Sequence, residues 1–242
     1  MEHVIEIKDL VVDYREKRAL DGLNLRVRRG EIFGFLGPNG AGKSTAIKAL
    51  LGLISPTQGQ VVLHGLSPDD LRSRAPVCFL PEEATYYRFL TPEEILAFYG
   101  EIFKIPKTIL RRRIGELLRL VGLEPVRRKL IGTFSKGMTQ KLSLAQALVN
   151  EPETLILDEP ASGLDPLARL DLRKILLDLK RKGCTVFFSS HELSEAELLC
   201  DSVAVIQSGK LVCSGALQEI LGNRRDRSLE RFFLDTIGGG TE

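Results

Sequence analysis

Nine consecutive residues, at positions 37–45, have the spacing of a phosphate-binding loop. The first eight, 37–44, fit the pattern G-x-x-x-x-G-K-[ST], and Thr45 follows directly. Glycines let successive backbone N–H groups turn toward a phosphate that side chains would otherwise obstruct. The lysine can reach the β- and γ-phosphates, and the hydroxyl that follows it can bind magnesium. We therefore predict a site for a nucleoside triphosphate with Mg²⁺. The residues predicted to form it are Gly37, Pro38, Asn39, Gly40, Ala41, Gly42, Lys43, Ser44 and Thr45.

Two adjacent carboxylates follow a second apolar run, at residues 155–157. They are Asp158 and Glu159. Successive side chains of a strand point in opposite directions, so one carboxylate can face magnesium while the other faces the attacking water. Hydrolysis of a phosphoanhydride needs this division between a metal ligand and a general base. An acidic turn that caps a helix is the alternative, but the phosphate-binding loop upstream favours the catalytic interpretation, with Asp158 on the metal and Glu159 as base.

Short apolar runs supply the strands that position these motifs. The runs 32–36, 155–157 and 185–188 are typical of buried parallel strands. Helical periodicity follows at 44–53 and at 166–182. Strand and helix alternate, which predicts an α/β fold: a P-loop NTPase core with a mostly parallel sheet.

Two further regions flank this core in the sequence. Apolar and polar residues alternate at 5–8 and 23–28, which predicts an N-terminal antiparallel β subdomain. Strand patterns are absent from 91–129, where Thr91 opens a capping box with proline at the first helical position and Gly122 ends a second helix. We expect an inserted helical subdomain at about residues 83–150.

Charge and composition exclude several classes. The chain has 34 basic and 32 acidic residues, far from the excess of a dedicated nucleic-acid binder, so we expect no nucleic-acid partner. The arginine-rich stretches 111–113 and 127–129 are expected to be a solvated helical face. No apolar run approaches the roughly 18 residues that span a bilayer, and the four cysteines lack the spacing of zinc ligands. We expect one domain over 1–242, with 222–242 as a short C-terminal extension that ends in a frayed tail.

The order of these motifs resembles that of ATP-binding subunits of ABC transporters, and five further segments extend the resemblance over nearly the whole chain. Tyr14 lies where that family stacks an aromatic ring on adenine. Ser-Gly-Leu-Asp at 162–165 matches the D-loop, which crosses the family's dimer interface and ends here in Asp165. His191 matches the switch histidine, which implies a catalytic contact with the γ-phosphate.

One matching segment, the Q-loop, departs from the family at its metal ligand. Phe-Leu-Pro-Glu at 79–82 has Glu82 where glutamine is usual. A carboxylate can still bind magnesium directly or through water, so the resemblance implies Glu82 as a third metal ligand beside Ser44 and Asp158. It also places a second negative charge near Glu159, which bears on the rate of hydrolysis.

The other departure is in the signature segment. Ser-Lys-Gly-Met at 135–138 matches the family's Ser-Gly-Gly-Gln at Ser135 and Gly137 only. The resemblance implies that these two residues serve the ATP of a second subunit, for which a hydroxyl, backbone amides and a helix N-terminus are suited. On local sequence alone, an ordinary serine-capped helix is the alternative.

Because the family's signature does not reach the phosphate loop of its own chain, the resemblance implies a head-to-tail dimer with a copy or a paralogue. It also implies separate transmembrane permease subunits and a location on the cytoplasmic face of the membrane. The signature variant, the run at 80–83 and the segment 228–233 resemble ABC-2-type exporters in particular. We therefore expect an Mg²⁺-dependent ATPase that drives export of a substrate the sequence does not identify.

Three alternatives stay open at this point. The altered Glu82 and signature residues are compatible with an ATP-dependent regulatory clamp of little turnover, although the intact catalytic motifs argue against it. An ABC-type ATPase of DNA repair or translation usually carries a coiled-coil insertion or a second ATPase domain, and this chain has neither. A small-molecule kinase shares the phosphate loop but needs neither a signature nor a switch histidine.

Overall fold

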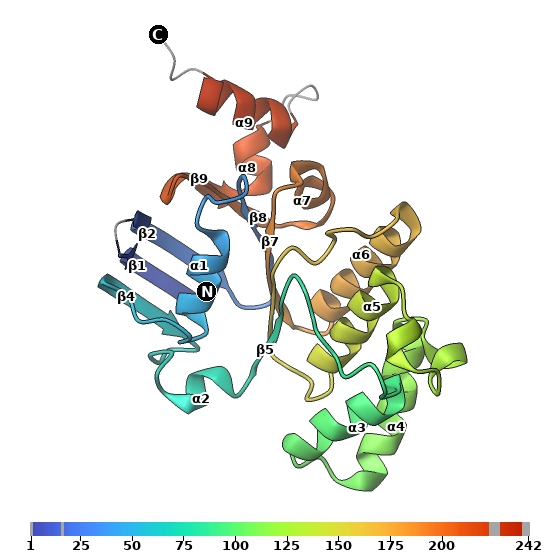
Figure 1. Ribbon diagram of the computed structural model, residues 1–242. Helices are drawn as coiled ribbons and strands as arrows, with labels where there is room; N and C mark the ends of the chain where they lie inside the picture. Colours follow the sequence, from blue (N-terminus) through green and yellow to red (C-terminus); the bar gives the residue numbers. More distant parts are fainter. Residues whose placement is uncertain (1, 16, 223–227, 239–242) are drawn as a thin grey trace.

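The computed structural model describes residues 2–15, 17–222 and 228–238, with side chains described through residue 233. In Figure 1 the N-terminal strands lie on one side of a central sheet, and the helices between residues 92 and 181 lie on the other. Of the predicted frayed tail, 238–242, Gly238 ends a helix and 239–242 lie outside the described residues, as do positions 223–227 of the predicted C-terminal extension. Among the described residues, no helix is both long enough and apolar enough to cross a membrane.

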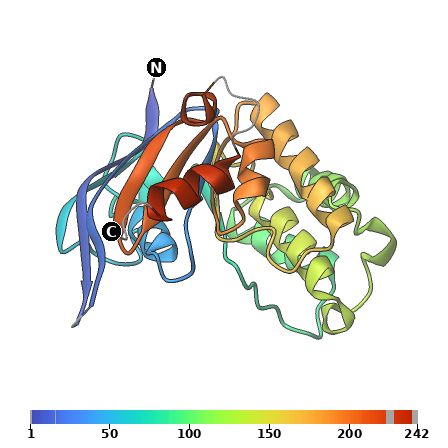
Figure 2. The ribbon, with the colours of Figure 1, turned by 90° about the horizontal axis from the view of Figure 1, so that it is seen from above.

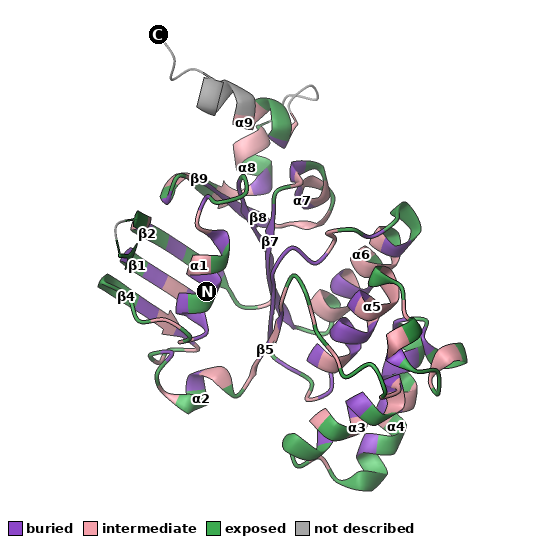
Figure 3. Cartoon of the chain, viewed as in Figure 1, coloured by how far each residue is buried: buried purple, intermediate pink, exposed green. Residues whose placement is uncertain are grey.

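The central sheet has six strands in the order β5-β6-β7-β3-β8-β9. The first five are parallel to their neighbours, and β9 is antiparallel to β8. Every residue of β3, β6 and β7 is buried, as Figure 3 shows, which confirms the predicted parallel core. The bounds are β3 Ile32–Leu36, β5 Val77–Leu80, β6 Thr154–Leu157, β7 Thr185–Ser190, β8 Ser202–Gln207 and β9 Lys210–Ala216.

A second, three-stranded sheet confirms the predicted antiparallel subdomain. Its order is β2-β1-β4, with both pairings antiparallel. Burial alternates along β2, where Leu23, Leu25 and Val27 face the core. In Figure 2 these strands lie on one side of the molecule and the helices α3 to α6 on the other. The strand bounds are β1 His3–Tyr14, β2 Lys17–Arg28 and β4 Gln58–Leu63.

Helix α1 (Lys43–Leu50) packs between the two sheets. Its Ile47 and Leu50 are fully buried in one cluster with Phe33 of β3 and Phe187 of β7, whose rings stack at 5.8 Å. The helix ends three residues before the predicted position 53. The cause is local: Gly52 takes a left-handed φ of 64°, and the amide of residue 53 closes the turn on a carbonyl five residues back.

The opposite face of the central sheet is covered by α5 (Lys136–Ala147), α6 (Pro166–Arg181) and α7 (Leu193–Leu199). Helix α6 begins where predicted because Asp165 caps it, accepting a hydrogen bond from the amide of Ala168 at 2.9 Å, and Pro166 fixes the first helical φ. Ile175 and Leu176 of its apolar stripe are buried against the sheet.

Between β5 and β6 the chain is helical, as predicted for the segment from Thr91 onward. Thr91 forms the predicted capping box, in which its hydroxyl accepts from the amide of Glu94 and the Glu94 carboxylate accepts from the Thr91 amide. Gly122 ends the second helix with a φ of 71°. The elements are α3 Pro92–Ile102, α4 Lys107–Leu120, the 3₁₀ turns Glu124–Val126 and Ile131–Thr133, and then α5. Three short helices complete the description: α2 Leu71–Arg74, α8 Leu217–Leu221 and α9 Leu229–Gly238.

Candidate functional site

A cavity of about 570 Å³ opens at the carboxyl end of β3, where the predicted phosphate loop lies. Its size is within the range of small-molecule sites. The phosphate loop forms its floor, and the β1–β2 turn, the β8–β9 turn and two carboxylates form its walls. The lining residues are Tyr14, Lys17, Arg18, Ala19, Asn39, Gly40, Gly42, Lys43, Ser44, Thr45, Glu82, Glu159, Ser208 and Gly209.

Glycine is required at two positions of the loop. A Cβ on Gly37 would lie 2.2 Å from the carbonyl oxygen of Ile206, and one on Gly42 would lie 2.7 Å from that of Ala19. Gly42 also has a φ of 110°, a conformation that other residues rarely adopt. The loop therefore passes close to β8 and β2 and turns directly into α1. No acidic residue in the first turn of α1 neutralises the partial positive charge of its N-terminus.

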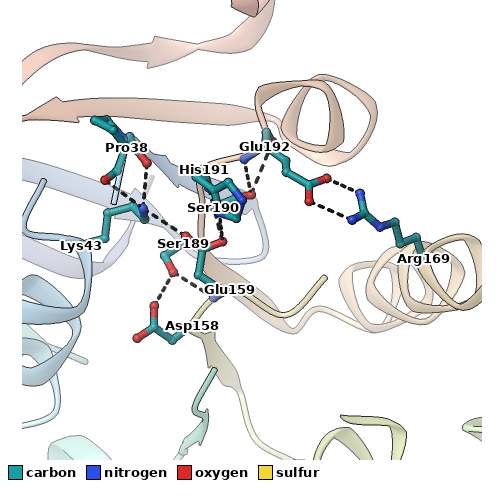
Figure 4. A network of polar contacts seen from close by, with 10 residues as sticks. Pro38, Lys43, Asp158, Glu159, Arg169, Ser189, Ser190, His191 and Glu192 are labelled. Carbon is teal, nitrogen blue, oxygen red and sulfur yellow. Dashed lines mark hydrogen bonds and ion pairs between the residues drawn. The ribbon is translucent and has the colours of Figure 1, made fainter. Parts of the chain in front are cut away.

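Lys43 is buried, and its ammonium bridges the loop to the end of β6 (Figure 4). Nζ donates to the carbonyl oxygens of Gly37 at 2.7 Å and Pro38 at 3.3 Å. It also lies 3.0 Å from Oε1 of Glu159. This last contact has the distance of an ion pair but not the geometry of a hydrogen bond, since Oε1 has no hydrogen-bond partner among the described residues.

Asp158 and Glu159 do diverge, but not because they continue the strand. β6 ends at Leu157, and Glu159 has a left-handed φ of 47°. The turn sends the Asp158 carboxylate to the hydroxyl of Ser189, whose Oγ donates to Oδ1 at 2.5 Å and accepts from the Glu159 amide at 3.0 Å. Ser189 on β7 thereby fixes both acidic residues.

Glu159 contacts the predicted switch residue on its other side. Oε2 lies 2.8 Å from Nδ1 of His191 and accepts from the His191 amide at 3.3 Å. The Glu159 side chain is 9% exposed and that of His191 is 42% exposed. A buried carboxylate thus stands between the ammonium of Lys43 and an imidazole that is open to solvent.

The residues present fit magnesium in the manner of nucleotide sites. No cluster of three or more His, Cys, Asp or Glu side chains in the part of the chain that the structure describes could hold a metal by itself. Mg²⁺ usually takes one or two protein ligands and completes its shell with water and substrate phosphates. Ser44 and Glu82 line the cavity, and Asp158, which precedes Glu159 in the chain, is buried and does not line it. We keep all three as proposed ligands.

Tyr14 lines the outer part of the cavity and is 44% exposed. Beside it, Arg18 is held by Asp13 at 3.0 Å and Asp21 at 2.9 Å. The hydrogen bond to Asp13 contributes most to raising the pKa of the Arg18 guanidinium above its usual value. We keep Tyr14 as the proposed adenine contact, since an aromatic ring can stack on a base.

Several predicted site residues are not among those that line the cavity: Gly37, Pro38, Ala41, Asp158, His191, Ser135, Gly137 and Asp165. Ser135 caps α5 by accepting from the amide of Met138 at 3.3 Å, and Asp165 caps α6. Gly137 faces Leu164 of the D-loop, where an added Cβ would be 3.8 Å from Cδ2. Gly137 and Leu164 therefore lie close together, and neither of their segments contributes a residue to the cavity lining.

Sequence reasoning missed several site residues. Lys17, Ala19, Ser208 and Gly209 line the cavity from two turns far apart in the sequence. No local pattern marks them, because what brings them together is tertiary: the Gly209 amide bonds to the carbonyl of Ala41 at 2.9 Å. Ser189 was within reach of sequence reasoning, since it follows a predicted buried strand and precedes the predicted switch.

A family model described as ABC transporter matches residues 20–162. A second model, for an AAA domain, matches residues 129–197. An uncharacterised ABC transporter ATP-binding protein of Nostoc sp. is 48% identical over 208 residues, which are 85% of this chain and 62% of that protein. The match thus spans less than two thirds of the Nostoc protein.

Two further relatives carry more specific names. The bacitracin transport ATP-binding protein BcrA of Bacillus licheniformis is 42% identical over 218 residues, 88% of this chain and 69% of that one. The linearmycin resistance ATP-binding protein LnrL of Bacillus subtilis is 32% identical over 219 residues, 90% of this chain and 70% of that one.

Among solved structures, the ATP-binding subunit of an ABC transporter superimposes with a TM-score of 0.88 at 34% identity. The match covers 97% of this chain and 99% of that one. Family model, relatives and fold agree, which confirms the resemblance of the motifs and the predicted fold class. The chain therefore belongs to the ABC transporter family, among its ATP-binding proteins.

Proposed function

We propose that the chain is an Mg²⁺-dependent ATPase in which Glu159 is the general base. The observation that carries the proposal is the convergence of Lys43, Glu159 and His191 at the carboxyl ends of β3, β6 and β7. Ligands of open α/β sheets bind at this edge. A buried carboxylate over a phosphate loop, with a histidine at hydrogen-bond distance, is an arrangement that can orient and deprotonate water.

Each residue then has a distinct part. The amides of the loop and the N-terminus of α1 bind the phosphates, and Lys43 exchanges its contact with Glu159 for phosphate oxygens. Glu159, so released, accepts the proton of water, and His191 keeps the carboxylate oriented. Magnesium, when bound through Ser44, Asp158 and Glu82, supplies charge neutralisation. Tyr14 stacks on adenine.

The second half of the proposal is a head-to-tail dimer of two such subunits. Ser135 and Gly137 lie at the start of a helix of twelve residues that has no acidic residue in its first turn, so this end can attract a phosphate. Because they do not line the cavity of their own chain, the phosphate they serve belongs to the ATP of a partner subunit, and Asp165 lies in the loop between the two sites.

We further propose that the dimer drives export through separate permease subunits, as an ABC-2-type system on the cytoplasmic face of the membrane. The names of two relatives, one of bacitracin transport and one of linearmycin resistance, support export of a small toxic compound. Phe89, just before α3, and Phe98, in α3, have exposed aromatic side chains that suit docking of an apolar partner segment.

The test is Mg²⁺-dependent ATP hydrolysis by the purified chain over a range of protein concentrations, beside Glu159→Gln, with sedimentation of both in ATP. We expect a rate that rises faster than linearly with concentration and a variant that loses turnover but collects as an ATP-bound dimer. A rate strictly proportional to concentration, with a monomeric variant, would refute the shared site. ATP binding without turnover at every concentration would favour the regulatory clamp.

A further inference from the structure

Arg169 joins two loops that border the nucleotide site (Figure 4). Its guanidinium makes a two-pronged contact with Glu192: Nη2 donates to Oε1 at 2.8 Å, and Nη1 donates to Oε2. Its Nε donates to the carbonyl oxygen of Leu164 at 3.1 Å. Because the guanidinium is planar and rigid, these bonds fix the distance between the D-loop and the segment around Glu192.

The position of Arg169 in the sequence is itself informative. It is the fourth residue of α6, near the N-terminus of that helix, where a positive charge is disfavoured by the helix dipole. The side chains of Arg169 and Glu192 are only 27% and 26% exposed, so the pair is partly withdrawn from water. A partly buried, bidentate pair restrains geometry far better than an exposed one does.

Glu192 follows the predicted switch residue His191 directly in the chain, so fixing Glu192 also restrains the backbone of His191. The Glu192 amide donates to Oγ of Ser190 at 2.9 Å, which closes a tight turn around His191. Within that turn, the His191 amide and ring both meet Oε2 of Glu159. The imidazole is therefore held on one side by Glu159 and on the other, through the backbone, by Arg169.

A neighbouring arginine provides an internal comparison. Arg173 lies one turn further along α6 and donates to Oε2 of Glu195 on α7 at 3.2 Å. It ties α6 to α7 through Glu195, from which Arg169 also lies 3.9 Å away, and its side chain is similarly buried, at 21% exposed. Among the described residues, no hydrogen bond links it to the D-loop or to residues 190–192.

We propose that Arg169 is a positioning residue for His191, which places the imidazole against Glu159 according to the position of the D-loop. The inference rests on the proposed function, in which the D-loop lies beside a second subunit. A subunit that moves Leu164 would move Arg169 and, through Glu192, the switch turn. A movement of the partner subunit would thereby change the position of His191 against Glu159. The path consists of the side chains of Arg169, Glu192 and His191 and the peptide unit between the last two.

The test compares four variants with the wild type: Arg169→Gln, Glu192→Gln, the double variant, and Arg173→Gln as the matched control. Each is measured for kcat and KM of ATP hydrolysis, for Kd of a fluorescent ATP analogue, and for Tm. Histidine labelled with ¹⁵N gives a readout that needs no turnover. The chain has only three histidines, so the Nδ1 resonance of His191 can be assigned by its loss in His191→Gln. Glu159→Gln marks the resonance of a ring that faces a neutral amide instead of a carboxylate.

We expect Arg169→Gln and Glu192→Gln each to lower kcat by roughly tenfold, because small misplacements of reacting groups have effects of that order or more. Nucleotide Kd should change less than about twofold, and the double variant should be no slower than either single variant, since both remove one link. In both single variants the His191 resonance should move toward its position in Glu159→Gln. Arg173→Gln should keep the wild-type kcat and resonance while losing a similar amount of Tm.

The inference is wrong if Arg169→Gln and Arg173→Gln have the same kcat and the same His191 resonance. The proposed function fails separately, when the wild type shows no hydrolysis that Glu159→Gln removes. In that event the ¹⁵N comparison of the same proteins still decides whether Arg169 places the imidazole.

Discussion

The phosphate loop and the signature segment are two helix N-termini with opposite surroundings. At the first, α1 begins under a cavity, and its Lys43 is buried in contact with Glu159 from the turn after β6. At the second, α5 begins with Ser135 and Lys136 exposed, and its cap is satisfied by its own chain. One terminus is enclosed by the fold, and the other is presented to the outside.

The difference supports the proposal that one chain supplies only half of the residues of a shared site. Everything that can bind phosphates and activate water in the first half is gathered by the fold itself. The second half consists of the N-terminus of α5 with Ser135 and Gly137. This helix start is suited to an anion, but these two residues do not line the cavity. Four substitutions can break or sharpen this contrast.

Lys43→Ala should have the largest effect, because it removes a charged donor from the enclosed half. We expect nucleotide affinity to fall by roughly 10- to 100-fold, the range for loss of hydrogen bonds to a charged group. Isothermal titration with ATP and Mg²⁺ measures it. Lys48→Ala, at the last turn of the same helix, is the control. Unchanged affinity in Lys43→Ala would remove the phosphate assignment.

Ser135→Ala should separate binding from turnover in the open half. We expect hydrolysis to fall by about tenfold while the affinity of dilute protein for ATP stays within about twofold, since the hydroxyl contributes only where a partner's ATP meets it. Steady-state rates and titration of the same preparation give both numbers. A matched loss of affinity in monomeric protein would show instead that the signature acts within its own chain. Thr133→Ala, just before α5, controls for local stability.

Tyr14→Ala should weaken the enclosed half by a smaller amount. Aromatic stacking contributes about 0.5–1.5 kcal/mol, so ATP affinity should fall roughly 2- to 12-fold. Tyr14→Phe keeps the ring and should bind as the wild type does, which distinguishes stacking from a role of the hydroxyl. If Tyr14→Phe binds as weakly as Tyr14→Ala, the ring is not the adenine contact.

Thr91→Ala tests a region that takes part in neither half. Loss of the capping box should cost about 1 kcal/mol, and for a chain of this size that lowers Tm by roughly 2–4 °C. ATP affinity should stay at the wild-type value. Differential scanning calorimetry and titration check the two results. A change of affinity would mean that α3 is coupled to the cavity, against the separation described above.

Those parts of the molecule that local sequence determines were predictable. The phosphate loop, its flanking strand and helix, the capping box at Thr91 and the proline start of α6 all depend on neighbours within a few residues. The end of α1 was placed three residues too late, because Gly52 and its left-handed turn were not weighed against the apolar residues beyond it.

Contacts between distant segments could not be predicted in the same way. Arg169 and Glu192 are 23 residues apart, and an arginine on a periodic helix is more often solvated than paired. The β8–β9 turn enters the cavity only because β8 lies next to β3 in the sheet. For Glu159, the sequence indicated the divergence of two carboxylates but not its cause, which is a left-handed backbone rather than the alternation of a strand.

The contact between Lys43 and Glu159 has a consequence for which anions the site can admit. The ammonium of Lys43 lies 3.0 Å from the Glu159 carboxylate, which serves as its counterion, so no counterion from solution is needed. A bound polyanion must displace the Glu159 carboxylate from the ammonium of Lys43. Binding of simple anions such as chloride or sulfate is therefore opposed. The same displacement releases the Glu159 carboxylate from Lys43. Its ability to act as a base then depends on the binding of an anion that Lys43 prefers to the carboxylate.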